Sequence, residues 1–184
     1  MPFASGGPRA VGPYAYIQRV PKLPATPCPF EQDFLDDSPY DPSVLLLDQM
    51  LELDAQQSLV RCRMATDPRD PFSAAQRTHP VRHPAHVSGA AILHATGSLG
   101  LVHAYYLLGL RHRDGWIGYG THIHRAVFRR LITPGTPVEA TCIATRVRED
   151  EDRYAVRYRF DFRADGRRYY EGDQTAFWFR TEND

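Results

Sequence analysis

Five of the eight histidines lie in one stretch, HPVRHPAHVSGAAILHATGSLGLVH, between positions 79 and 103. They are His79, His83, His86, His94 and His103. Imidazole titrates near neutral pH, so it can give or take a proton during a reaction, and it is also a common metal ligand. The stretch therefore indicates acid–base chemistry, a metal site or a polar loop.

Metal binding is the weakest of these three interpretations. His79, His83 and His86 are spaced four and three residues apart, which would place them on one face of a helix. Pro80 and Pro84 disfavour a continuous helix there. A zinc site needs three or four convergent ligands, and the sequence has no paired cysteines or His-Glu helix motif. We predict no metal and no cofactor.

The composition is that of an ordinary soluble domain. Lys+Arg and Asp+Glu number 22 each in 184 residues, so no net charge favours nucleic acid or an anionic membrane. Cys28, Cys62 and Cys142 fit neither a disulfide framework nor a zinc knuckle. We find no signal peptide, and the apolar stretch 104–110 is too short to span a bilayer. We expect a cytoplasmic protein.

The chain is expected to hold one domain, residues 31–184, preceded by a proline-rich segment, residues 1–30. That segment is expected to run extended or to be disordered, or to pack on a partner subunit. Asp41-Pro42 favours a helix start, so we predict a short helix that leads into a strand before residue 54. Alternation predicts a further strand over 58–66.

The second half is patterned as strands. Tyr154, Val156, Tyr158, Phe160 and Phe162 alternate with polar residues, which is typical of a half-buried strand. An Asp-Gly pair at 165–166 favours a hairpin into a last strand, 168–180. With strands over 116–129 and 137–147, this half predicts an antiparallel meander of four strands.

One long helix is predicted from Ser88 to about Leu108, capped by Ser88 and closed by Gly109. Its small residues allow a sheet to approach closely; they are Gly89, Ala90, Gly97, Gly100 and Ala104. A curved antiparallel sheet wrapped around one such helix is the α+β hotdog architecture.

Three stretches resemble the hotdog-fold β-hydroxyacyl-acyl carrier protein dehydratases. LLLDQMLELD is similar to the opening segment of that family, RTHPVRHPAHVSGAAILHATG to its active-site segment, and AVFRRLITPGTPVEA to its FRxPVxPGD strand and turn. The resemblance spans roughly residues 44–180. It implies a homodimer that binds an acyl thioester carried on the phosphopantetheine of acyl carrier protein or coenzyme A.

The resemblance also implies which residues form the site. The acid that the family places on the helix falls at His94, and the best match to its catalytic histidine is His79, with one residue inserted. A second hotdog group, the butyrolactone-signal synthases, matches His86 to His94 without a gap, although Ser88 replaces a proline. His79 and His86 therefore compete for one role, and His94 is the candidate proton donor.

Gly89 matches the glycine whose N–H binds the thioester carbonyl in the family. The neighbouring N–H of Ala90 and the helix dipole would assist it. Arg129 and Arg130 match the FRR segment and are candidates to bind a phosphopantetheine phosphate, with a solvated strand end as the alternative. The other histidines are expected to be loop residues (His83, His112) or structural residues (His103, His122, His124).

Dehydration or hydration of a β-hydroxyacyl or enoyl thioester is the reaction that the resemblance favours first. A thioesterase is the first alternative, and Asp67 and Asp70 are the upstream acids that could serve it. A non-catalytic acyl-binding subunit is the second, because the helix acid is replaced by His94.

Overall fold

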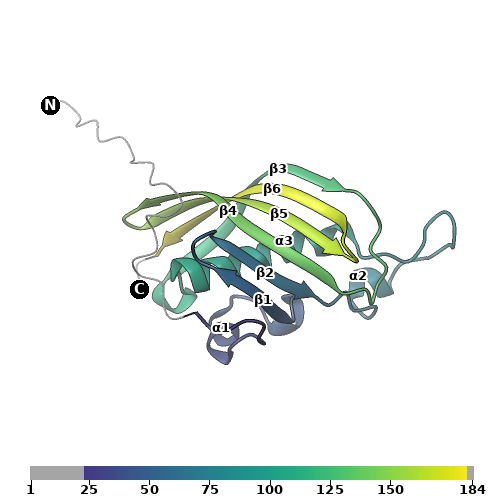
Figure 1. Cartoon of the computed structure of the whole chain (residues 1–184), viewed down its shortest axis with the longest axis horizontal. Coiled ribbons are helices and arrows are strands. Elements are labelled where there is room, and N and C mark those ends of the chain that lie inside the picture. Colours follow the sequence, from purple (N-terminus) through teal and green to yellow (C-terminus); the bar gives the residue numbers. More distant parts are fainter. Residues whose placement is uncertain (1–22, 182–184) are drawn as a thin grey trace.

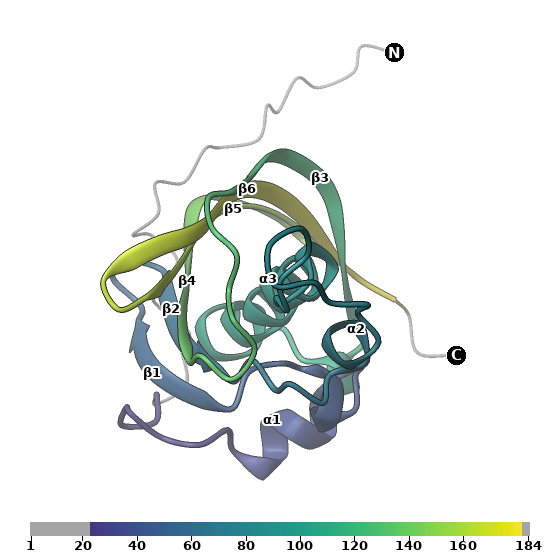
Figure 2. The same ribbon diagram turned by 90° about the vertical axis from the view of Figure 1, so that its right-hand side faces the viewer.

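The computed structural model describes residues 23–181, which form one curved antiparallel sheet around a central helix (Figure 1, Figure 2). The order of the strands in the sheet is β1-β2-β4-β5-β6-β3. Their bounds are β1 (Gln49–Asp54), β2 (Leu59–Met64), β3 (Trp116–Phe128), β4 (Val138–Asp150), β5 (Arg153–Ala164) and β6 (Arg167–Arg180). This arrangement confirms the predicted architecture.

The central helix is α3 (Gly89–His103), which continues as a π-helical turn, η3 (Ala104–Leu108). The Ser88 hydroxyl accepts a hydrogen bond from the Ala91 amide at 3.1 Å, and Gly109 closes the helix at φ 70°. Both predicted caps are thus confirmed. The remaining elements are short: α1 (Gln32–Asp37), η2 (Pro42–Val44), α2 (Pro71–Ala74) and η4 (His112–Asp114).

Two predicted elements differ in the structure. β3 pairs with β6 and not with β4, because residues 129–137 carry the chain across the open end of the sheet, so the meander holds only β4, β5 and β6. The predicted helix after Asp41 is a single 3-10 turn. The Asp41 carboxylate caps it through the Ser43 amide at 2.9 Å, but Leu46 has a left-handed φ of 59°, which a helix does not allow.

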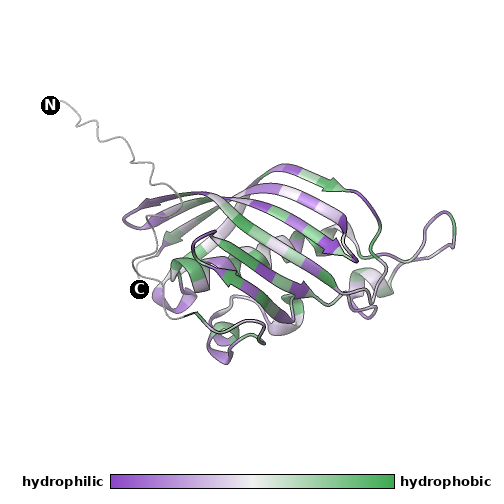
Figure 3. Cartoon of the chain, in the orientation of Figure 1, coloured by the Kyte–Doolittle hydropathy of each residue, from purple (hydrophilic) through white to green (hydrophobic). Residues whose placement is uncertain are grey.

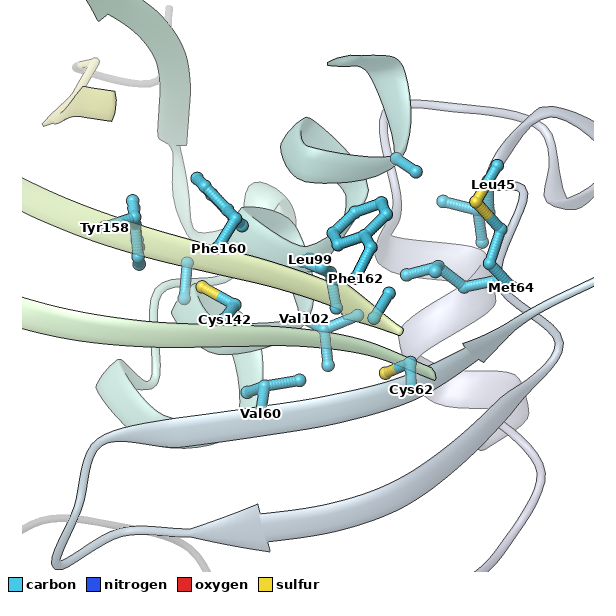
Figure 4. Packing of buried hydrophobic residues seen from close by; sticks show 14 of the residues in the cluster. Leu45, Val60, Cys62, Met64, Leu99, Val102, Cys142, Tyr158, Phe160 and Phe162 are labelled. Carbon is cyan, nitrogen blue, oxygen red and sulfur yellow. The ribbon is translucent and has the colours of Figure 1, made fainter. Parts of the chain in front are cut away.

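The core lies between α3 and the concave face of the sheet. Phe160 and Phe162 from β5 meet Leu99 and Val102 from α3, and all four side chains are buried (Figure 4). Residues 89–108 are long and apolar enough to cross a membrane, but most of this helix is buried inside the domain. The alternation of polar and apolar residues along the strands is visible in Figure 3. The helix is therefore the core helix of this domain.

The two edges of the sheet differ. β1 is covered by a backbone bridge in which Cys28 and Met50 exchange hydrogen bonds of 3.0 and 2.9 Å. This contact belongs to the predicted proline-rich segment, of which residues 1–22 lie outside the described part. At the other edge, β3 has no second neighbour among residues 23–181, and Tyr119 and Ile123 are more than half exposed there.

Candidate active site

The start of α3 presents backbone N–H groups without partners. In an α-helix the first four amides have no acceptor within the helix. Ser88 satisfies Ala91, whereas the amides of Gly89 and Ala90 have no hydrogen-bond partner in the described part of the chain. The preceding segment is fixed by Gln76, whose side chain bonds the backbone N–H and C=O of His86 at 3.2 and 2.6 Å. These two amides are therefore preorganised to stabilise a developing negative charge.

Phe128, at the end of β3, packs on this helix start. A Cβ at position 89 would lie 3.3 Å from the tip of the Phe128 ring, so the close packing favours glycine at this position. Arg129 follows directly, and its guanidinium donates to the Glu171 carboxylate at 2.7 Å. Arg130 donates to the backbone carbonyl of Arg168 at 3.1 Å. Both arginine side chains are therefore held against β6, and Arg129 is already paired with an acid.

His86 is held in one tautomer by its own loop. Its Nδ1 lies 2.8 Å from the carbonyl oxygen of Pro84, and a carbonyl can only accept, so Nδ1 carries the proton. The Nε2 atom of neutral His86 then keeps its lone pair. The ring of His83 packs edge-on against the His86 ring, with the centroids 5.0 Å apart.

His79 lies in the loop that projects between α2 and α3 (Figure 1). Its Nδ1 accepts hydrogen bonds from the backbone amides of Val81 and Arg82 at 3.1 and 3.0 Å, and its backbone pairs with His83. His79 thus shapes the loop tip, and these hydrogen bonds all stay within its own loop. No group of three His, Cys, Asp or Glu residues in 23–181 is arranged to hold a metal ion.

His94 is anchored by a residue that is distant in the sequence. Its Nε2 lies 2.7 Å from the carbonyl oxygen of Val44, so Nε2 carries the proton and Nδ1 of the neutral ring has the lone pair. The Tyr40 ring stands edge-on to the imidazole, with the centroids 5.3 Å apart. The segment 40–44, far away in sequence, therefore sets both the orientation and the tautomer of His94.

His94 lies between the helix start and a cavity of about 370 Å³. Ala90, His94, Gly97 and Leu101 follow one another at intervals of four, three and four residues, which places them along one flank of α3. Gly97 and Leu101 line the cavity, as does Tyr40. The free amide of Ala90, the imidazole of His94 and the cavity thus succeed one another along the helix.

The cavity separates α3 from β3, β5 and β6, and aromatic side chains dominate its wall. Its polar contributors include Thr96 and Gln174, which are joined at 3.0 Å, and Gln174 also donates to the Tyr170 hydroxyl at 3.2 Å. Its aromatic residues are Phe34, Tyr40, Tyr105, Trp116, Tyr119, Tyr158, Phe160 and Trp178. Such a lining suits an apolar group with few polar contacts.

The only carboxylate in this lining, among the described residues, is that of Asp37. It accepts from the backbone amides of His112 and Arg113 at 2.8 and 2.9 Å and from the Arg113 guanidinium at 2.8 Å. Burial by itself would raise the pKa of Asp37, but the hydrogen bonds from Arg113 and His112 outweigh it and hold the pKa below its ordinary value. Asp37 is therefore a structural clamp.

Asp67 and Asp70 do not line the cavity. The Arg69 side chain and backbone amide donate to Asp67 and lower its pKa to about 2. Asp70 caps α2 by accepting from the Ser73 amide at 3.1 Å. Both carboxylates thus have structural roles within their own loop.

The remaining histidines have other surroundings. His103 is completely buried and bonds Ser58 through Nε2 at 2.9 Å and the Tyr158 hydroxyl through Nδ1 at 3.2 Å. Burial lowers its pKa to about 3, so the ring is neutral at pH 7. His122 and His124 stack on each other along exposed β3. His112, the first residue of η4, is exposed, and it is the one histidine of the described residues that lines the cavity; its Nδ1 lies 3.3 Å from the carbonyl oxygen of Trp116.

Sequence patterns did not indicate several residues of this site. Tyr40 and Val44, which fix His94, carry no motif, and neither does the pair of Thr96 and Gln174. Trp178 lies in the aromatic run AFWF, which indicated the end of the last strand but not a cavity wall.

Similarity to proteins of known structure was found, although no family model and no curated protein matches the sequence. A mutant thioesterase PA1618 from Pseudomonas aeruginosa superimposes with a TM-score of 0.57 at 14% identity, over 90% of this chain and 99% of that one. The thioesterase HI1161 from Haemophilus influenzae gives 0.50 at 13% identity, over 75% of this chain and 81% of that one. Together with the sheet that wraps α3, these matches show that the chain has the hotdog fold.

Proposed function

We propose that this protein hydrolyses an acyl thioester carried on the phosphopantetheine of coenzyme A or acyl carrier protein. One observation carries the proposal: free amides at the start of α3, His94 with a fixed tautomer, and an apolar cavity lie in that order along one flank of the helix. The similarity to two thioesterases favours hydrolysis over the dehydration that the sequence resemblance ranked first.

The reaction follows from these positions. Nδ1 of His94 takes a proton from a water molecule, and the water oxygen attacks the thioester carbon. The carbonyl oxygen, which becomes negative, is stabilised by the N–H groups of Gly89 and Ala90. The C–S bond then breaks, and the departing thiolate receives the proton from the His94 imidazolium. The products are a carboxylic acid and a free thiol.

Val44 supports the charged form of His94 during this cycle. Its carbonyl oxygen accepts from Nε2 whether the ring is neutral or protonated, so the hydrogen bond is kept in both states. His86 lies two residues before Ser88, with its lone pair on Nε2. We assign it a secondary role in positioning the phosphopantetheine arm, because it precedes the helix, whereas His94 lies one turn from Gly97 in the cavity wall.

The reaction type can be tested with three thioesters of coenzyme A: saturated acyl, β-hydroxyacyl and enoyl. We expect the protein to release free thiol from the saturated substrate, measured with a thiol reagent, and to form no enoyl product from the β-hydroxyacyl one, measured by mass spectrometry. Water elimination without thiol release would reverse this assignment and restore the dehydratase. Binding without either product would indicate an acyl-binding subunit.

A homodimer is expected from the free edge of β3. This strand of 13 residues offers unpaired backbone groups, and Ile123 at its middle is 57% exposed. Two copies that pair through β3 would form one continuous sheet. We expect sedimentation equilibrium at micromolar concentration to give the dimer mass.

Ile123→Lys should weaken this dimer, because two like charges would meet near the centre of the paired strands. Val81→Lys is the matched control: Val81 is 83% exposed at the tip of the projecting loop, away from β3. A monomer for the unmodified chain, or equal dissociation of both variants, would contradict pairing through β3.

A further inference from the structure

Trp178 separates two hollows of the molecule. On one side its indole lines the cavity beside α3, and on the other it borders a groove on the outside, formed with Asp152, Arg153, Phe179 and Arg180. Among the described residues, Trp178 is the only one that lines both hollows. The side chain, which is 6% exposed, is therefore a partition.

The partition is held by packing. A Cβ on Gly118 of β3, the residue paired with Trp178 across the strands, would lie only 2.3 Å from the indole ring, so the ring lies directly on the glycine backbone. The indole Nε1 is buried and has no hydrogen-bond partner in the described part of the chain. Replacing Trp178 by an apolar residue therefore removes volume, and the neighbouring Tyr158 hydroxyl keeps His103 as its partner at 3.2 Å.

Gln174 contacts Thr96 near His94, so Trp178, four residues further along β6, lies toward the other end of the cavity, as does Trp116 of β3. Along α3 the lining runs from Thr96 to Tyr105, which is roughly 13 Å at 1.5 Å per residue. Along β6 it runs from Gln174 to Trp178, which is also roughly 13 Å at about 3.3 Å per residue. The helix and the strand thus give the same length, and Trp178 forms the far wall together with Trp116.

We propose that Trp178 sets the length of the acyl group, so that the substrates are unbranched acyl thioesters of medium length. An extended chain advances roughly 1.2 Å per bond, one third of the spacing per residue of an extended backbone, so the cavity holds roughly ten carbons. This inference rests on the proposed function, because it places the thioester beside His94 and the acyl chain in the cavity. A longer chain meets the indole.

A substitution at Gly97 should shorten the cavity, the opposite of the effect expected for Trp178→Ala. It lies in the wall of the cavity one turn beyond His94, and a Cβ added there would meet nothing within 4 Å. A leucine at this position would project into the free space without a clash, and a residue with better helix propensity than glycine also stabilises a helix. Gly97→Leu should therefore shorten the cavity in a folded protein.

The test measures binding, so that it does not depend on turnover. S-alkyl pantetheine thioethers from butyl to hexadecyl cannot be hydrolysed, and their affinities are measured by titration calorimetry. For the unmodified protein we expect affinity to rise about fourfold per methylene, the equivalent of about 0.8 kcal/mol, and to stop rising near decyl. Trp178→Ala should extend the rise to longer chains, and Gly97→Leu should end it earlier.

Phe177→Ala is the matched control, because Phe177 is an aromatic neighbour that borders the outer groove but not the cavity. It should leave the chain-length profile unchanged. If Trp178→Ala does not fold, as judged by circular dichroism, Trp178→Leu and Gly97→Leu decide the result. Identical profiles in all variants, or no rise with length in the unmodified protein, would overturn the proposal. If the affinities follow the expected profiles but the protein releases no thiol from acyl-coenzyme A, the role of Trp178 in chain length stands and the hydrolase assignment is wrong.

Discussion

Replacing His94 by glutamine should lower the rate of thiol release by about a hundred- to ten-thousand-fold, the usual cost of losing a general base. Glutamine can still donate an N–H to the Val44 carbonyl, so the local structure is kept, but it cannot take a proton from water. Steady-state kinetics with a saturated acyl-coenzyme A, together with the thermal midpoint of each variant, measure both effects. His94→Glu should recover part of the rate, because a carboxylate can act as the base.

Asp67→Asn is the matched control for this experiment. Asp67 is paired with Arg69 in its own loop and lies outside the cavity lining, so its loss should leave thiol release within about twofold. His86→Gln should raise KM more than it lowers kcat, if His86 positions the carrier arm. Full activity in both histidine variants would show that the histidines are structural and that catalysis lies elsewhere.

His103 should make the protein less stable as the pH falls below about 6.5. The folded protein holds this histidine neutral, with a pKa of about 3, whereas in the unfolded chain it binds a proton near pH 6.5. Between these values the unfolded state binds the extra proton, so the free energy of unfolding decreases by up to about 1.4 kcal/mol per pH unit. The contribution is fully present above about pH 6.5.

The measurement is urea unfolding of the unmodified protein and of His103→Gln at several pH values between 7 and 4.5. Glutamine does not titrate, so the free energy of unfolding of the variant should fall less steeply as the pH is lowered. At pH 7 the variant should be less stable than the unmodified protein, because Ser58 or Tyr158 loses a partner. His83→Gln, a change in the exposed projecting loop, should keep the original slope. Equal slopes for unmodified protein and His103→Gln would contradict the assignment.

The parts of the fold that follow local rules could be predicted from the amino-acid sequence. The alternation through Phe160 and Phe162 predicted β5 and its buried face, since side chains in a strand alternate between the two faces of the sheet. Ser88 and Gly109 marked the ends of the long helix through capping chemistry. The order of motifs between 44 and 180 gave the hotdog resemblance, which the solved structures bear out as a fold.

Which residues contact one another across the fold could not be predicted from local patterns. The partner of β3 is β6, because pairing depends on how residues 129–137 cross the end of the sheet and not on the pattern within either strand. His94 obtains its tautomer from Val44, 50 residues away, and Trp178 becomes a partition only when Gly118 lies beneath its ring. Contacts between residues distant in the chain leave no periodic signal, because each depends on how separate elements pack. The sequence therefore identified the histidines, and packing determined the partners and the tautomers of His86 and His94.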